Sequence, residues 1–85
     1  MIARLKGEVV AIGEDNVIID VGGVGYLVFC SSKAKARMTL NCSIILAIEM
    51  NVREDRITLF GFFDKVEQDW FKLLLTVQGV GAKAV

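Results

Sequence analysis

Short extended runs divided by turn-forming residues fill residues 1–62 and exclude a mainly helical architecture for this part of the chain. The runs are rich in β-branched and aromatic side chains, which favour strands. They span residues 2–12, 17–21, 26–30, 43–52 and 57–62. The first run contains Gly7, a candidate bulge or barrel bend. Because residues 22–25 and 53–56 form short links, the runs on either side of each link are expected to pair as hairpins.

A short helical segment is predicted to interrupt these strands after the third. Residues 31–38 alternate small and basic side chains, and Ser32 can cap the amino end of one or two helical turns. Five short strands with such an insert, many glycines and no internal repeat fit a closed barrel of the OB type. An open five-stranded sheet fits less well, because its apolar edges would be exposed. We therefore predict a mainly β fold, with a five-stranded OB-type barrel as a domain over residues 1–63.

The hydrophobic pattern changes to a helical period at Asp64. Apolar residues at helical spacing follow, namely Val66, Trp70, Leu73, Leu74 and Val77. Asp64 and Glu67 have the spacing of a capping box, and Gly79 is suited to end the helix. Residues 82–85 are typical of the first turn of a second helix, which is too short to form alone. We predict that residues 64–85 begin a helix-hairpin-helix domain and that the chain is a fragment or a truncated form.

The sequence Gly-Val-Gly-Ala-Lys at residues 79–83 is a candidate DNA contact. Gly79 and Gly81 let the backbone turn tightly and approach a phosphate without a side chain in the way. Amide groups at the start of the next helix would bind the anion, Val80 would pack the turn down, and Lys83 would add a positive charge. Such contacts do not depend on base sequence. An ordinary αα-hairpin with a glycine link is the alternative.

Glu54 and Asp55 are adjacent acids at the predicted tip of a hairpin between apolar strands. The simplest interpretation is a solvated turn. On a surface that faces DNA, however, two carboxylates repel phosphates, so they would serve to keep a strand away or to split two strands apart. Two adjacent acids at a turn make a poor Mg²⁺ site.

Charge and composition argue against several other classes of protein. Ten basic and ten acidic residues give zero net charge, so any DNA contact would be local to one face. The chain has no His, and no Ser or Cys nucleophile is paired with a plausible base, so we expect neither catalysis nor a metal or cofactor. Cys30 and Cys42 are expected to be small apolar residues. Without a signal peptide or an apolar run of membrane length, a cytoplasmic location is expected.

Five stretches of the chain, in order, resemble the RuvA family of DNA-junction-binding proteins. They are MIARLKG at 1–7, VGGVGY at 21–26, VRED at 52–55, LFGF at 59–62 and GVGAK at 79–83. Their order and spacing are those of the family over nearly the whole chain. Ala3 departs from the Gly that is frequent in the family, and Ala82 departs from a common Pro, which mainly preorganises a helix start.

The resemblance implies a three-part protein: an OB-type barrel, a domain with two helix-hairpin-helix motifs, and a mobile carboxy-terminal domain that engages the RuvB motor ATPase. It also implies a non-catalytic homotetramer that holds a four-way (Holliday) junction open in recombination and DNA repair. Glu54 and Asp55 match the family's acidic pin. The first helix-hairpin-helix is matched by Gly79, Val80, Gly81 and Lys83. The second motif and the motor-binding domain have no counterpart in this sequence, so we do not expect the chain to couple to the motor.

Two other functions stay open at this point. The barrel and the apolar helix would also suit a pure assembly module, because 54% of the residues are hydrophobic. A single-strand binder of the OB type would instead need basic and aromatic side chains along one barrel face. Tyr26, Phe29 and Phe60 are its aromatic candidates, although we expect them mainly in the core.

Overall fold

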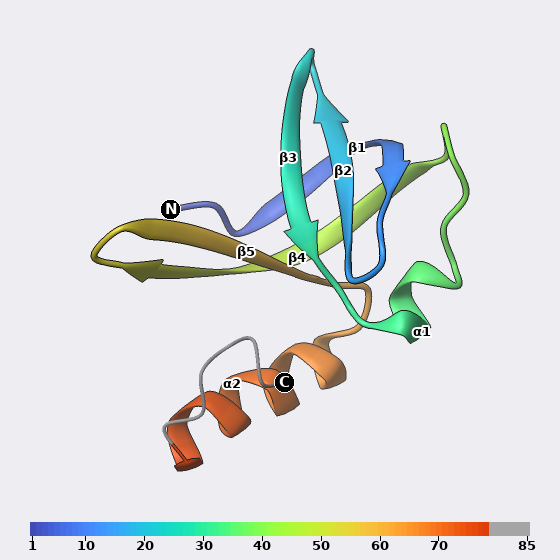
Figure 1. The fold of residues 1–85 in the computed structure, drawn as a ribbon. Coiled ribbons are helices and arrows are strands. Elements are labelled where there is room, and N and C mark those ends of the chain that lie inside the picture. Colours follow the sequence, from blue (N-terminus) through green and yellow to red (C-terminus); the bar gives the residue numbers. More distant parts are fainter. Residues whose placement is uncertain (79–85) are drawn as a thin grey trace.

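The computed structural model describes residues 1–78, which form a closed barrel with a helix on its outer side (Figure 1). In chain order the elements are β1 (Arg4–Ile12), β2 (Asn16–Val21), β3 (Val24–Phe29), α1 (Ser32–Lys35), β4 (Ser43–Arg53), β5 (Arg56–Phe62) and α2 (Lys65–Gln78). The strand order around the barrel is β1-β2-β3-β5-β4. The predicted five-stranded OB-type barrel, with a helical insert after the third strand and a helix after the fifth, is confirmed.

Antiparallel hairpins and one parallel contact close the barrel. β1 pairs with both β2 and β4, and β3 pairs in parallel with β5. The turn between β2 and β3 contains Gly22 and Gly23 at φ values of 60° and 94°, a left-handed conformation that favours glycine. Closure gives every strand two neighbours, so the apolar edges of an open sheet are avoided.

Strand β1 approaches β2 closely at Gly7. A Cβ atom on Gly7 would lie 2.3 Å from the carbonyl oxygen of Asp20, so no larger residue fits there without moving the strands apart. The bulge that the sequence suggested for Gly7 lies elsewhere. The register shifts between Val9 and Ala11, which makes Val10 the extra residue. Gly7 therefore permits close strand contact, and the irregularity follows three residues later.

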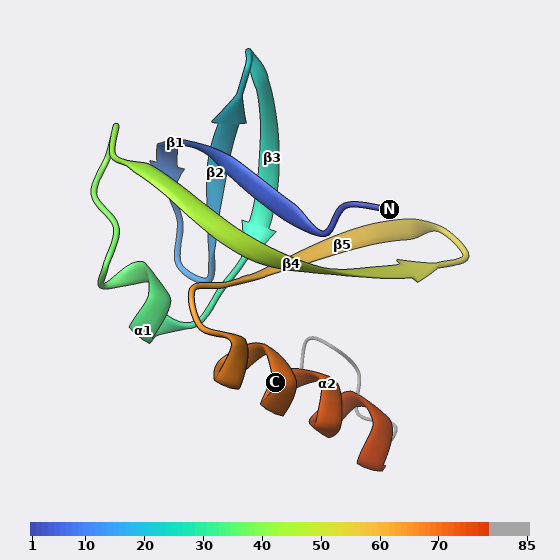
Figure 2. The same cartoon turned by 180° about the vertical axis from the view of Figure 1, so that it is seen from behind.

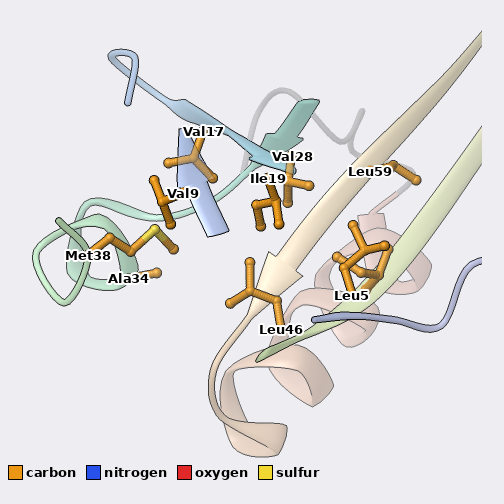
Figure 3. Packing of buried hydrophobic residues seen from close by; sticks show 10 residues of the cluster. Leu5, Val9, Val17, Ile19, Val28, Ala34, Met38, Leu46 and Leu59 are labelled. Carbon is orange, nitrogen blue, oxygen red and sulfur yellow. The ribbon is translucent and has the colours of Figure 1, made fainter. Parts of the chain in front are cut away.

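Apolar side chains from every strand fill the barrel interior (Figure 3). The fully buried ones are Val9, Val17, Ile19, Val28 and Leu46. Ala34 and Met38, from α1 and the turn after it, cover one end of this core. The cap of α1 is Ser31, whose Oγ accepts a hydrogen bond from the Ala34 amide at 3.1 Å. The prediction of Ser32 as the cap was therefore wrong by one residue.

Helix α2 packs on the outer surface of the barrel through a second, aromatic cluster. Phe60 and Phe62 of β5 are buried there together with Phe71 of α2. The Phe71 ring centre lies 4.8 Å from that of Phe60 and 5.1 Å from that of Phe62, distances typical of favourable aromatic pairs. Among the described residues, no helix is long and apolar enough to cross a membrane.

A carboxylate on β4 adds a polar contact to this packing. The Glu49 side chain accepts a hydrogen bond from Gln68 Nε2 at 2.8 Å and pairs with Lys72 Nζ at 3.1 Å. Gln68 and Lys72 are four residues apart on α2, so one acid contacts two successive turns of the helix. The helix is thereby fixed alongside the β4–β5 hairpin.

The first turn of α2 is held by the segment around α1. Asp64 pairs with Arg37 at 4.0 Å, and the guanidinium of Arg37 also lies 4.2 Å from the centre of the Phe63 ring. Glu67 accepts a hydrogen bond from Ser31 Oγ at 3.3 Å. The predicted capping box between Asp64 and Glu67 was wrong, because both carboxylates contact side chains of the α1 segment instead.

Candidate functional site

The β4–β5 hairpin places two acidic side chains at an exposed tip. Its strands stay paired over seven positions, the last of which is Arg53↔Arg56, so Glu54 and Asp55 form a two-residue turn. In both views this tip projects away from α1 and from the body of the barrel (Figures 1 and 2). Both acids are exposed, and neither forms an ion pair with any other residue of the part described. The acids lie at a hairpin tip as predicted, and their role stays a prediction.

The two faces of the hairpin tip differ in chemistry. Side chains alternate between faces along a strand, and paired residues share a face. Val52 and Ile57 are one such pair, on the face that continues inward to the buried Leu59, and they are 61% and 65% exposed. Arg53 and Arg56 form the next pair and lie on the opposite face. Further from the turn, the same face carries Glu49 and Phe60. Both contact side chains of α2, so α2 packs on this face.

The predicted glycine-containing DNA contact follows the end of α2. Gly79, Val80, Gly81 and Lys83 lie outside the described residues, so this site stays a prediction. The structure does place the helix that leads to it. In both views α2 starts below the end of β5 and runs back along the hairpin, so that its carboxy-terminal end lies toward the acidic tip (Figures 1 and 2).

The aromatic candidates for single-strand binding do not form an open stacking surface. Phe60 is buried, and its ring contacts those of Phe29, at 5.9 Å, and of Phe71. Tyr26 and Phe29 are half-buried, and Tyr26 packs against the barrel core. The expectation that these side chains lie mainly in the core is confirmed for Phe60, whereas Tyr26 and Phe29 are only partly buried, so the support for a single-strand binder is weakened.

A groove of about 560 Å³ lies between the barrel and α2. Most of its lining is apolar and comes from Phe29, Phe60, Phe62, Trp70, Phe71 and Leu74. Cys30 is the thiol in this lining, and burial raises its pKa above the ordinary value. A thiol that keeps its proton is a poor nucleophile, which agrees with its interpretation as a small apolar residue.

Two features of the site were missed when the sequence was considered alone. The Arg-Glu-Asp-Arg order of residues 53–56 puts one base on each side of the acids, and this is a signal that the sequence carries. That Arg53 and Arg56 face one another depends on the strand register. The contact of Glu49 with α2 could not be predicted from the sequence, because a single acid in an apolar strand does not reveal which helix it contacts.

Comparison with known proteins agrees with this geometry. Residues 1–61 match the family described as the RuvA N terminal domain. The chain is 58% identical over 84 residues to the Holliday junction branch migration complex subunit RuvA of Beijerinckia indica subsp. indica, covering 98% of this chain and 41% of that protein. It is 55% identical over 83 residues to the RuvA subunit of Paramagnetospirillum magneticum, covering 98% of this chain and 39% of that protein. The chain thus spans about two fifths of the length of these relatives, and it belongs to the RuvA family.

Proposed function

We propose that this chain is the junction-binding part of a non-catalytic subunit that holds four-way DNA junctions while a partner ATPase drives branch migration in recombination and repair. The observation that carries the proposal is the exposed acidic turn at the end of a hairpin that projects from a closed barrel. The relatives' printed name, a Holliday junction branch migration complex subunit, supports the same role.

The physical role of the acidic tip follows from its charge. A carboxylate and a phosphate about 4 Å apart in water repel each other by about 1 kcal/mol, and more where the local dielectric is lower. Glu54 and Asp55 have no ion-pair partner among the described residues, so no residue of this part offsets their repulsion of a strand that approaches. In the homotetramer that we propose, four such tips meet near the crossover and keep the separated strands apart.

The remaining parts of the proposal extend beyond the barrel. We assign residues 1–63 to the barrel domain and residues 64–85 to the start of the helix-hairpin-helix domain. Gly79, Val80, Gly81 and Lys83 would grip the phosphate backbone of a duplex arm, whereas ATP hydrolysis would belong to a RuvB-type motor. We place the protein in the cytoplasm, where such DNA is found in bacteria.

The first experiment is a gel-shift titration of the 85-residue chain against a four-way junction, a matching duplex and a single strand, at low and moderate salt. We expect preference for the junction, with affinity that falls as salt rises because phosphate contacts release counterions. A clear preference for the single strand would contradict the proposal.

Neutralising the acidic tip tests its role directly. The double variant Glu54→Gln/Asp55→Asn should bind duplex DNA about three- to tenfold more tightly at low salt and lose part of its preference for the junction, because the repulsion is gone. The matched control is Glu14→Gln/Asp15→Asn, which removes two adjacent acids from the exposed turn between β1 and β2. We expect little change in the control.

A second candidate function, an assembly module without DNA binding of its own, is favoured by exposed apolar side chains. They include Val52 and Ile57 on the hairpin and Val66, Trp70, Leu73 and Leu74 on α2. Absence of DNA binding by the parent chain, together with concentration-dependent association in sedimentation, would favour this second function.

A further inference from the structure

Two like charges face each other at the neck of the β4–β5 hairpin. Arg53 and Arg56 are directly opposite partners in the antiparallel register, an arrangement that is unfavourable for two cations. Both are exposed, and neither side chain has an ion pair or hydrogen bond with another residue between 1 and 78, although Glu54 and Asp55 adjoin them in sequence. Each guanidinium keeps its five N–H donors for a partner outside this part of the chain.

Two cations of α2 near this face are already paired. Lys72 of α2 pairs with Glu49, and Lys65 pairs with Asp69 at 3.4 Å. The arginine pair supplies uncompensated positive charge at the tip end of the hairpin face that α2 shares. The pair lies between the acidic turn and the part of the β4–β5 hairpin against which α2 packs.

We propose that Arg53 and Arg56 form a phosphate-binding pair that holds the DNA backbone against the α2-facing side of the hairpin, next to the repelling acidic tip. This inference rests on the proposed function and adds an attractive contact to it. A guanidinium presents parallel N–H donors that match two oxygens of one phosphate, and two guanidinium groups on neighbouring strands offer a broader anionic contact. The arginine pair would attract the DNA backbone to the side of the hairpin, and the acidic tip would repel it. Together they would direct a DNA strand along the hairpin and away from its tip.

The test compares double variants in the 85-residue chain by junction titration over a range of salt. Arg53→Gln/Arg56→Gln should bind a four-way junction roughly tenfold less tightly, and the slope of log affinity against log salt should become shallower by about 1 to 2 units. Lys6→Gln/Lys33→Gln removes the same charge from exposed positions on β1 and α1, and should leave the slope nearly unchanged. Arg53→Lys/Arg56→Lys should restore the slope but only part of the affinity, because lysine lacks the paired donors.

A junction whose phosphates next to the crossover are replaced by neutral methylphosphonates locates the contact. The parent chain should lose several-fold in affinity for this junction, whereas Arg53→Gln/Arg56→Gln should lose nothing further. Equal losses in both would overturn the inference and leave the proposed function standing.

Three other outcomes would also overturn the inference. One is an affinity loss in the lysine control that equals the loss in the arginine variant. Another is a change of sedimentation in the arginine variant with unchanged salt dependence, which would show that the arginines contact a second copy of the chain. The last is failure of the parent chain to bind any of the DNAs, and this outcome would overturn the proposed function as well. Thermal unfolding of each variant shows whether the barrel is intact.

Discussion

The pKa of the Cys30 thiol depends on several neighbouring groups. Cys30 directly follows β3 and lies in the groove beside α2. Burial raises the pKa of its thiol, the positive charge of Lys35 lowers it in part, and the charges of Glu67 and Asp15 raise it further. Charges from three separate segments therefore shift the pKa of one thiol, so this pKa depends on the folded arrangement of those segments.

The rate of alkylation of Cys30 should reveal this raised pKa. In a Cys42→Ser variant, the midpoint of the iodoacetamide rate against pH should lie above that of the same chain in urea, because only the thiolate reacts. The unfolded chain then releases its proton first as the pH rises. Cys30 therefore contributes stability below the unfolded pKa and loses it as the pH rises through the folded pKa. Equal midpoints in the folded and unfolded chain would contradict the prediction.

At the scale of elements, the pairing of β1 with β2 depends on the absence of a side chain at Gly7. Gly7→Ala should destabilise the barrel by about 1–3 kcal/mol or more, because the added methyl group meets a backbone oxygen that cannot move without its strand. Urea unfolding followed by circular dichroism measures the change. Gly25→Ala is the control, since its methyl group would meet only the Cγ2 methyl group of the Ile18 side chain, at 3.2 Å, and no backbone atom. Similar losses in the two variants would show that general strand propensity, rather than the close approach, determines the effect.

The elements themselves could largely be predicted from the sequence, and their local details could not. Strand and helix positions follow from hydrophobic periods, which each segment carries within itself. Asp64 and Glu67 have capping-box spacing, yet their carboxylates contact the α1 segment. The extra residue in β1 is Val10, while the nearby glycine has another role. Both details depend on which element lies opposite, and a local pattern does not contain that information.

The same distinction applies to the candidate site. Glu54 and Asp55 could be placed at a tip because apolar strands of suitable length flank them on both sides. The opposition of Arg53 and Arg56 needs the register, and a shift by one residue would have separated them. The predicted contact at 79–83 lies outside the residues that the structure describes.

At the scale of the whole molecule, two hydrophobic clusters divide the structure into a barrel and a docked helix. The barrel cluster has members on every strand, whereas the aromatic cluster joins β5 to α2 through Phe71. Among the described residues, the main contacts of α2 with the strands are those with β5 and β4. Docking of α2 and folding of the barrel should therefore be separable.

Phe71→Ala should weaken the docking of α2 by about 3 kcal/mol while the barrel stays folded, because Phe71 is not part of the barrel cluster. In hydrogen exchange, the amides of α2 should lose protection and those of β1 and β2 should keep it. Val66→Ala, at a position 69% exposed, is the control and should change neither. Loss of protection throughout the barrel would show that the two clusters fold as one cooperative unit.

The pairing of β4 with β5 also restricts how the hairpin can change in length. One additional cross-strand pair would extend the tip by about 3.4 Å, and it would turn the last pair to the opposite face. Two additional pairs, about 7 Å, are needed before two arginines next to the turn share a face with α2 again. The length of the hairpin can therefore change only in steps of one pair, and an odd number of added pairs would place arginines next to the turn on the apolar face.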